Sequence, residues 1–267
     1  MKRIAFVICL GAVLAACASA PTGMSREQAA AIVGAPDRSP GDRVNDERRK
    51  AVDMLAFVGP RPGMTALDVS AARGYTTELI ARAVGPTGKV YGQVPPPRQP
   101  TQAPPAQPEG AAAPPAPGTP PPLPTFVERQ KNPALAHMQL VRQPFENPVP
   151  AEIADGKADL VTLMFNYHDM GHLGVDRASM NRAIFKALKP GGVYVIADHA
   201  GRPGTGLSES GTLHRVEEAF VVREVESAGF RLTARGDFLR NPNDPRDKNT
   251  PDPAMPKDEF VLKFVKP

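Results

Sequence analysis

The side chains best suited to chemistry lie in three short polar stretches. Asn166-Tyr167-His168-Asp169 directly follows an apolar run, Asp198-His199 ends a second one, and His214-Arg215 comes soon after. Histidine takes up or releases a proton near neutral pH, which suits deprotonation of an attacking oxygen or nitrogen. Polar groups at the ends of strands are also common in ligand sites. We therefore predict four catalytic residues, His168, Asp169, His199 and His214.

A purely structural role is the alternative for these residues. Asp198 and His199 would then pair only to cap a loop, and Tyr167 would be half-buried packing. His168 and His172 are four residues apart with Asp169 between them, a spacing that suits a metal ion on a helix but means little in a loop. We predict no metal ion here.

Alternating strands and helices are expected to position the polar stretches. Short apolar runs between turn residues predict strands at residues 65–69, 89–92, 137–141, 159–165, 193–198, 231–235 and 259–265. Apolar residues at helical spacing predict helices at 46–57, 76–84, 176–188 and 212–228, with a short one from Phe126. This alternation favours a doubly wound α/β fold with a mostly parallel sheet.

The turn after the first strand is the expected ligand site. Residues 67–75 read Leu-Asp-Val-Ser-Ala-Ala-Arg-Gly-Tyr, a buried strand that runs into a tight turn and then a helix. In doubly wound proteins the ligand lies beyond the carboxyl ends of the strands, at such a turn. Together with Leu188-Lys189-Pro190-Gly191-Gly192 before the fifth strand, this segment resembles the class I S-adenosylmethionine-dependent methyltransferases.

That resemblance implies a Rossmann-like, seven-stranded sheet with an antiparallel last strand, and S-adenosylmethionine as the cofactor. Asp68 matches the acid that ends strand one in the family, and Gly74 is the last glycine of its G-x-G-x-G pattern. Ser70 and Ala72 replace the other two glycines, and Gln93 lies near the position of the acid that holds the ribose. The implied cofactor-binding residues are Asp68, Ser70, Ala72, Gly74, Tyr75, Gln93, Asn166 and Tyr167.

Further segments resemble one branch of that family, a group of exported bacterial proteins described as predicted methyltransferases. These segments are residues 46–50, 55–57, 62–64, 74–78, 166–169, 198–199, 213–215 and 260–267. The branch tends to keep its turn glycines, whereas this sequence has Ala71-Ala72-Arg73.

The N-terminus predicts export. Lys2 and Arg3 precede an apolar run that ends at Leu14 and is too short to span a bilayer, as in a signal peptide. Leu14-Ala15-Ala16-Cys17 resembles the bacterial lipoprotein box, whose cysteine is acylated after cleavage; an ordinary signal peptide is the alternative. We predict a signal peptide over 1–17 with lipidation at Cys17, a flexible tether over 18–43 and a methyltransferase-like domain over 44–267. The predicted location is the cell envelope, on the periplasmic face of the outer membrane.

Composition adds one insert and excludes one class of partner. Residues 95–124 contain 14 prolines among Ala, Gln, Gly and Thr, which predicts a disordered insert that packs no core. The net charge of +4 comes from interspersed charges of both signs, which indicates no binding of nucleic acid. The predicted partners are an unknown small-molecule substrate and the membrane, through the lipid anchor.

Two functions of different classes follow. The first is methyl transfer from S-adenosylmethionine to a small molecule or an envelope component. The second is a degenerate methyltransferase fold that binds a ligand or partner without catalysis, favoured by the lost glycines and by the cytoplasmic origin of S-adenosylmethionine. An NAD-dependent oxidoreductase is disfavoured, because no G-x-G-x-x-G follows the first strand.

Overall fold

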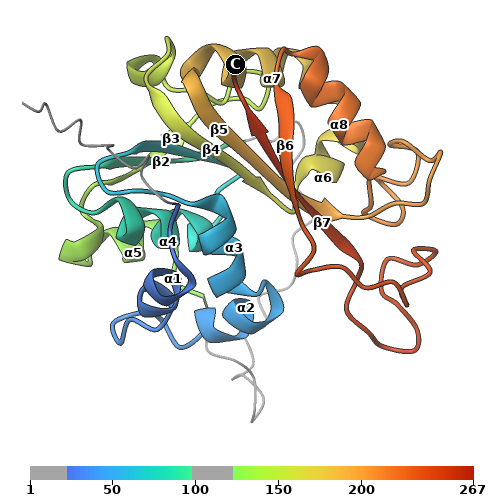
Figure 1. Cartoon of the computed structure of the whole chain (residues 1–267), viewed down its shortest axis with the longest axis horizontal. Helices are drawn as coiled ribbons and strands as arrows, with labels where there is room; N and C mark the ends of the chain where they lie inside the picture. The colour runs from blue at the N-terminus through green and yellow to red at the C-terminus, as the bar shows by residue number, and fades with distance from the viewer. Residues whose placement is uncertain (1–22, 98–122) are drawn as a thin grey trace, which may run out of the picture.

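The computed structural model describes residues 23–97 and 123–267, which form a seven-stranded sheet with helices on both faces (Figure 1). The strand order is β3-β2-β1-β4-β5-β7-β6. Strands β1 to β5 run parallel, and β7 is antiparallel to both of its neighbours. The predicted α/β fold and its antiparallel last strand are therefore confirmed. The strands are β1 (Thr65–Val69), β2 (Lys89–Val94), β3 (Met138–Arg142), β4 (Ala158–Met164), β5 (Leu188–His199), β6 (Arg231–Gly236) and β7 (Glu259–Val265).

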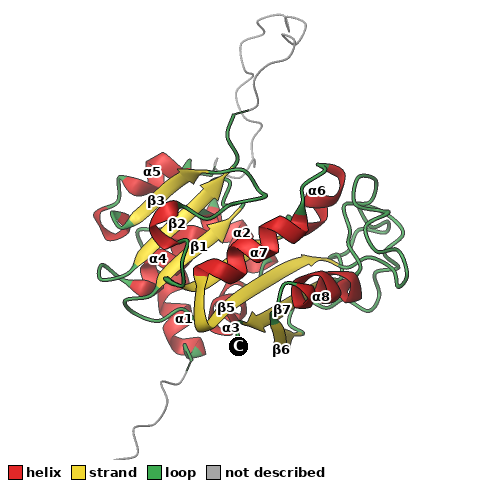
Figure 2. Ribbon diagram, turned by 90° about the horizontal axis from the view of Figure 1, so that it is seen from above, coloured by secondary structure: helices red, strands yellow, loops and turns green. Residues whose placement is uncertain are grey.

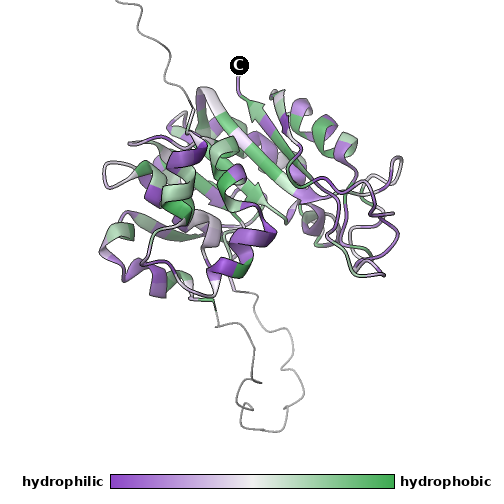
Figure 3. Cartoon of the chain, turned by 60° about the horizontal axis from the view of Figure 1, so that its bottom comes forward, coloured by the Kyte–Doolittle hydropathy of each residue, from purple (hydrophilic) through white to green (hydrophobic). Residues whose placement is uncertain are grey.

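Figures 1 and 2 show the helices in two layers, with α1 to α5 on one face of the sheet and α6 to α8 on the other. Parallel strands covered on both faces are apolar along most of their length, and the middle strands are largely green in Figure 3. None of the helices in the described ranges is long and apolar enough to cross a membrane. The helices are α1 (Arg26–Val33), α2 (Asp42–Arg48), α3 (Ala51–Val58), α4 (Tyr75–Val84), α5 (Phe126–Gln130), α6 (Tyr167–His172), α7 (Arg177–Ala187) and α8 (Glu218–Ser227), with single 3-10 turns at Pro133–Leu135 and Ala151–Ile153.

Two predicted helices have the wrong bounds. The helix expected over 46–57 is interrupted, because Lys50 adopts a left-handed backbone with φ of 47° between α2 and α3. The helix expected over 212–228 begins only at Glu218, so His214 and Arg215 lie in the loop that follows β5. His214 itself has φ of 51°, which a continuous α-helix cannot contain.

The predicted tether is wrong over the part that the structure describes. Residues 26–33 form α1, whose start is a capping box: the Ser25 hydroxyl accepts from the Gln28 backbone N–H, and the Gln28 side chain accepts from the Ser25 N–H. Ala29 and Val33 of this helix are buried against α3 and α4. The predicted signal peptide, Cys17 and most of the proline-rich insert lie outside the described residues.

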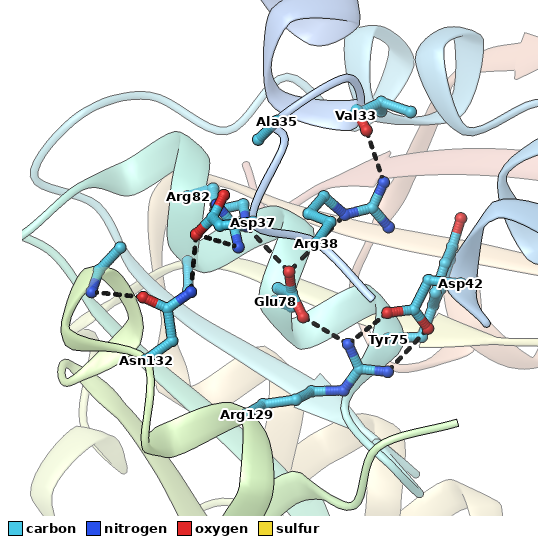
Figure 4. A network of polar contacts seen from close by, with 12 residues as sticks. Val33, Ala35, Asp37, Arg38, Asp42, Tyr75, Glu78, Arg82, Arg129 and Asn132 are labelled. Carbon is cyan, nitrogen blue, oxygen red and sulfur yellow. Dashed lines mark hydrogen bonds and ion pairs between the residues drawn. The ribbon is translucent and has the colours of Figure 1, made fainter. Parts of the chain in front are cut away.

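A buried network of arginines and carboxylates attaches the N-terminal helices to α4 and α5 (Figure 4). Arg129 of α5 donates to both carboxylate oxygens of Asp42 at 2.7 and 2.8 Å and also contacts Glu78 of α4. Arg38, between α1 and α2, makes two hydrogen bonds to Asp46 at 2.7 and 2.9 Å. Because these groups are almost entirely buried, removing one would leave its partner as an uncompensated charge.

Candidate functional site

The turn between β1 and α4 has the backbone shape that glycines favour, although two of its residues carry side chains. Ser70, Ala72 and Gly74 have φ of 59°, 49° and 82°. A left-handed conformation costs a residue with a Cβ roughly 1–2 kcal/mol. The Ser70 N–H donates to Gln93 Oε1 at 2.9 Å, and the Ala71 N–H donates to the Gln93 carbonyl at 2.8 Å. The contacts to Gln93 thus stabilise a turn that the residue types alone disfavour.

Asp68 is a buried carboxylate beneath this turn. Its two oxygens accept hydrogen bonds from the hydroxyls of Thr77 and Thr162 at 2.6 and 2.8 Å. Burial raises the pKa of Asp68 to about 6, against the lowering effect of those two hydroxyls. The pair of threonines therefore fixes the carboxylate beside the first turn of α4.

Two predicted cofactor-binding side chains are directed elsewhere. Gln93 is fully buried, and both ends of its side-chain amide are hydrogen-bonded within the protein. The amide oxygen accepts from the Ser70 N–H, and the amide nitrogen donates to the Gln143 carbonyl at 2.6 Å. Tyr167 is fully buried in the core of the α7 and α8 face, where its hydroxyl donates to Glu224 at 2.9 Å. Neither side chain is free to hold a ribose, and for Tyr167 the structural alternative is the one observed.

Two cavities flank the turn and share part of their walls. One, of about 300 Å³, is lined by Asp68, Tyr75 and Phe165. The other, of about 470 Å³, is lined by Glu146 and Asp169. Ser70, Ala72 and Asn166 line both, and Ser70 Oγ lies 2.6 Å from Asn166 Oδ1. The turn thus separates two hollows that one elongated ligand would fill together.

Arg49, at the end of α2, lines the smaller cavity. Its guanidinium lies over the rings of Tyr75 and Phe165, 5.2 and 4.8 Å from their centroids. Its Nε is buried and has no hydrogen-bond partner among the described residues. Burial and the nearby Arg48 lower the pKa of Arg49. A buried cation with a spare donor favours an anionic ligand.

The predicted catalytic residues form one cluster at the carboxyl edge. The ring centroid of His168 lies 5.4 Å from that of His199 and 5.5 Å from that of His214. The ring centroids of His214 and His172 are 5.7 Å apart. Asp169 lies among them, with Oδ1 at 3.2 Å from His168 Nε2 and 3.3 Å from His214 Nδ1. The four residues predicted to be catalytic, His168, Asp169, His199 and His214, are therefore neighbours in the structure.

His168 is held between two carboxylates. Its Nδ1 lies 2.6 Å from Asp198 Oδ1, and its backbone N–H donates to Asp198 Oδ2 at 2.7 Å. Burial acts to lower the pKa of His168, but hydrogen bonds and charge from Asp169 and Asp198 raise it to about 9. Burial likewise acts to raise the pKa of Asp169, but His168 and His214 lower it to about 2. At neutral pH the imidazole of this pair therefore holds the proton.

His199 lies on the other side of His168 and lines a larger cavity of about 720 Å³. Its Nδ1 is 2.8 Å from Glu259 Oε1, and the two residues are direct cross-strand partners of β5 and β7. Arg48 and residues 238–241 line the same cavity. The centroid of the His199 ring is 5.7 Å from that of Phe165, which lines the smaller cavity by the turn. The walls of the two cavities therefore adjoin at these two rings.

Arg215, which follows His214 in the third polar stretch, is a structural residue. It is fully buried and pairs with Asp244 at 2.9 Å while donating to the Lys248 carbonyl. These contacts attach the segment between β6 and β7 to the end of β5. Arg49, Glu146 and Glu259 are the site residues that sequence reasoning missed. Arg49 lies within the stretch 46–50 that carried the family resemblance, which was the available signal.

The comparisons with known proteins agree with this architecture. No family model matches the chain, and no curated protein matches it. Among solved structures, a SAM-dependent methyltransferase from Aquifex aeolicus aligns over 91% of this chain and 100% of its own, with 18% identity and a TM-score of 0.54. A putative S-adenosylmethionine-dependent methyltransferase from Listeria monocytogenes aligns over 84% and 99%, with 11% identity and a TM-score of 0.52.

These likenesses show the fold, which is the Rossmann-like fold of class I S-adenosylmethionine-dependent methyltransferases. The same fold also carries other chemistry. The [4+2]-cyclase SpnF aligns over 82% of both chains, with 15% identity and a TM-score of 0.52. Function must therefore be argued from the site.

Proposed function

We propose that the protein is an S-adenosylmethionine-dependent methyltransferase-like lipoprotein that methylates a small molecule or an envelope component. Arg49 is the observation that supports this most. S-adenosylmethionine ends in a carboxylate, which a guanidinium binds through paired, charge-assisted hydrogen bonds. Arg49 lines the cavity beside the turn, and its guanidinium, whose Nε has no partner among the described residues, is the cation that such a group would meet there.

The remaining polar groups of the two cavities suit the other end of the cofactor. Asn166 lines both cavities and offers amide groups next to the turn. Glu146 lines the larger of the two, and a carboxylate there accepts hydrogen bonds from ribose hydroxyls in place of the acid missing from β2. Asp68, Gly74 and Tyr75 complete the walls as parts of the turn and of α4.

The cofactor supplies an electrophilic methyl group when it is bound. His199 is suited to take the proton that the acceptor loses on gaining the methyl, because it lines the 720 Å³ cavity and contacts Phe165 of the cofactor side. Glu259 beside its Nδ1 orients the ring and stabilises the imidazolium that forms.

Calorimetry tests the cofactor site. Titration of the purified protein with S-adenosylmethionine should give one site, and Arg49→Met should weaken it at least tenfold, since a charged hydrogen bond contributes about 1.5–3 kcal/mol. Arg43→Met, on the same helix but outside both cavities, should leave the affinity unchanged. Equal affinity in Arg49→Met and the parent would contradict this assignment.

A non-catalytic binding module is the second candidate, supported by the turn itself. Side chains at Ser70 and Ala72 narrow the approach to the backbone, and the Gln93 amide is already occupied within the protein. If neither S-adenosylmethionine nor S-adenosylhomocysteine binds at millimolar concentration, this second function is the correct one.

The anchor and the location are part of the same proposal. The lipoprotein-like Leu14-Ala15-Ala16-Cys17 and the resemblance to the exported branch support acylation at Cys17. Ala18 follows it, as in lipoproteins sorted to the outer membrane. Mass spectrometry of protein from membranes should find a diacylated Cys17 as the first residue, and any other mature start would contradict it.

A further inference from the structure

We propose that His168, Asp169 and His214 bind a divalent transition-metal ion. One donor atom from each, two imidazole nitrogens and one carboxylate oxygen, lie within 4.8 Å of one another. Two nitrogens with one carboxylate oxygen is a ligand set typical of Zn²⁺ or Fe²⁺ rather than of Mg²⁺ or Ca²⁺, which prefer oxygen. This site does not depend on methyl transfer.

The distances between donors suit a metal at their centre. Zinc binds nitrogen and oxygen at roughly 2.0–2.2 Å, and the edge of a tetrahedron with such bonds is about 3.3–3.6 Å. Asp169 Oδ1 is 3.2 Å from His168 Nε2 and 3.3 Å from His214 Nδ1. Both separations are close to that edge, and the two nitrogens lie within 4.8 Å of each other, so coordination requires an adjustment of the side chains and loss of the His168 Nε2 proton to the solvent.

The outer contacts of the ligands are those of a preorganised metal site. His168 presents Nε2 to the cluster because its Nδ1 is held 2.6 Å from the fully buried carboxylate of Asp198. Asp169 presents Oδ1 because its Oδ2 accepts from the Asn166 side chain at 2.5 Å. In metal sites such second contacts fix the ring tautomer and the orientation of the carboxylate.

A further imidazole and an open side adjoin the three donor atoms. His172 Nε2 lies 3.8 Å from Asp169 Oδ1, one helical turn after His168 on α6. The side chains of His172 and His214 are 34% and 41% exposed, which leaves a path for the ion. Asp169 also lines the 470 Å³ cavity, so a bound ion would lie beside the proposed ligand site.

The prediction of no metal rested on sequence spacing alone. His168, Asp169 and His172 are on a helix, the case in which their spacing has meaning. The decisive ligand, His214, is 45 residues further along from Asp169 and comes from a loop whose position no spacing rule gives.

Metal titration tests the site directly. The mature protein, prepared from membranes in detergent without a polyhistidine tag, is stripped with EDTA and titrated with Co²⁺ as a spectroscopic probe. We expect one equivalent bound, with visible absorption bands of a four- or five-coordinate ion. Competition by Zn²⁺, Fe²⁺ and Mn²⁺ under anaerobic conditions then ranks the metals.

Variants separate a metal site from a simple cluster of hydrogen bonds. His214→Ala and Asp169→Asn should each weaken Zn²⁺ binding at least 100-fold, while His137→Gln, which changes the one histidine outside the cluster, should not. Circular dichroism and thermal melting check that each variant is folded. Less than one equivalent of Co²⁺ bound by the parent protein, or unchanged affinity in folded His214→Ala, would overturn the proposal.

Discussion

Two polar clusters lie within this molecule, one buried and one partly exposed, and they differ in whether their partners are complete. In the network of Arg38, Arg129 and their carboxylates, each of these charges has an opposite charge within the protein. In the cluster of His168, Asp169, His199 and His214, the rings line or adjoin cavities and several donor atoms converge on one oxygen. The first region binds parts of the chain to one another, and the second has room for something else.

The choice of cation explains the difference. Arginine stays charged at all accessible pH values and presents a rigid fork of donors, so a network built from it is permanent. Histidine changes charge near neutrality and can donate, accept or coordinate. The buried arginine network and the partly exposed histidine cluster therefore have different roles.

Breaking the arginine network should have the largest effect on stability. Arg129→Met leaves the carboxylate of Asp42 buried without its cation, whereas Glu78 keeps its pair with Arg82; the loss should cost about 3–5 kcal/mol in the free energy of unfolding, measured with urea. Lys186→Met is the control, because its pair with Asp155 is exposed and should contribute less than about 1 kcal/mol. Similar losses in both variants would show that the network has no special role.

The histidine cluster should make stability depend on pH. The pKa of His168 is raised from 6.5 to about 9, so the folded state holds this proton more tightly than the unfolded state. Its contribution is complete below pH 6.5 and is lost as pH rises through 9, a change of about 3 kcal/mol. Denaturation of EDTA-treated protein should show this decline, and His168→Gln should abolish it. An equal decline in the variant would assign the pH dependence to other groups.

Gln93 distinguishes a ligand contact from an internal one. Gln93→Glu replaces the donor to the Gln143 carbonyl with a buried carboxylate oxygen, so it should lower stability by about 1–3 kcal/mol. Gln139→Glu, at an exposed position on β3, should change stability by less than about 0.5 kcal/mol. If Gln93→Glu instead preserved stability and improved the affinity for S-adenosylmethionine, Gln93 would face the ribose after all.

Relief of backbone strain at the turn should have the smallest effect. Ala72→Gly removes a left-handed cost of about 1–2 kcal/mol but adds about 0.4–1 kcal/mol of entropy to the unfolded chain, so we expect a gain of up to about 1 kcal/mol. Ala83→Gly, within α4, should have the opposite sign, since glycine is unfavourable in a helix interior. Thermal unfolding of both variants measures the direction of each change in stability. A loss of stability in Ala72→Gly would contradict the claim that the backbone at Ala72 is strained.

Local patterns predicted most of the fold because each element has its own signal. The alternation of apolar runs gave β1 and β7 with their observed bounds, and Gly85 ended α4 as expected. The N-terminal helix was missed although Ser25 and Gln28 form a capping box, because an alanine-rich, charged stretch also suits a tether. The helix at Thr212 was overextended because the apolar spacing around Leu213 and Val216 continues into the loop.

The candidate site was predictable only where a residue's position in the sequence determines its place in the fold. Strand ends meet at one edge of a parallel sheet, which is why His168, Asp169 and His199 were grouped correctly. The direction of each side chain was not predictable: Tyr167 points into the core, whereas its neighbour His168 points to the cluster. Arg49 and Glu259 come from elements at opposite ends of the chain, so only the tertiary structure brings them to the same region.

The pairing of β5 with β7 has one more consequence. His199 and Glu259 are opposite each other at the end of that ladder. The register of the two strands therefore also places the Glu259 carboxylate 2.8 Å from the His199 imidazole. Transient detachment of β7 would remove the carboxylate from the ring and open the 720 Å³ cavity at once. Amide hydrogen exchange along Glu259–Val265 would therefore report how often the carboxylate separates from the imidazole, and this measurement needs no known substrate.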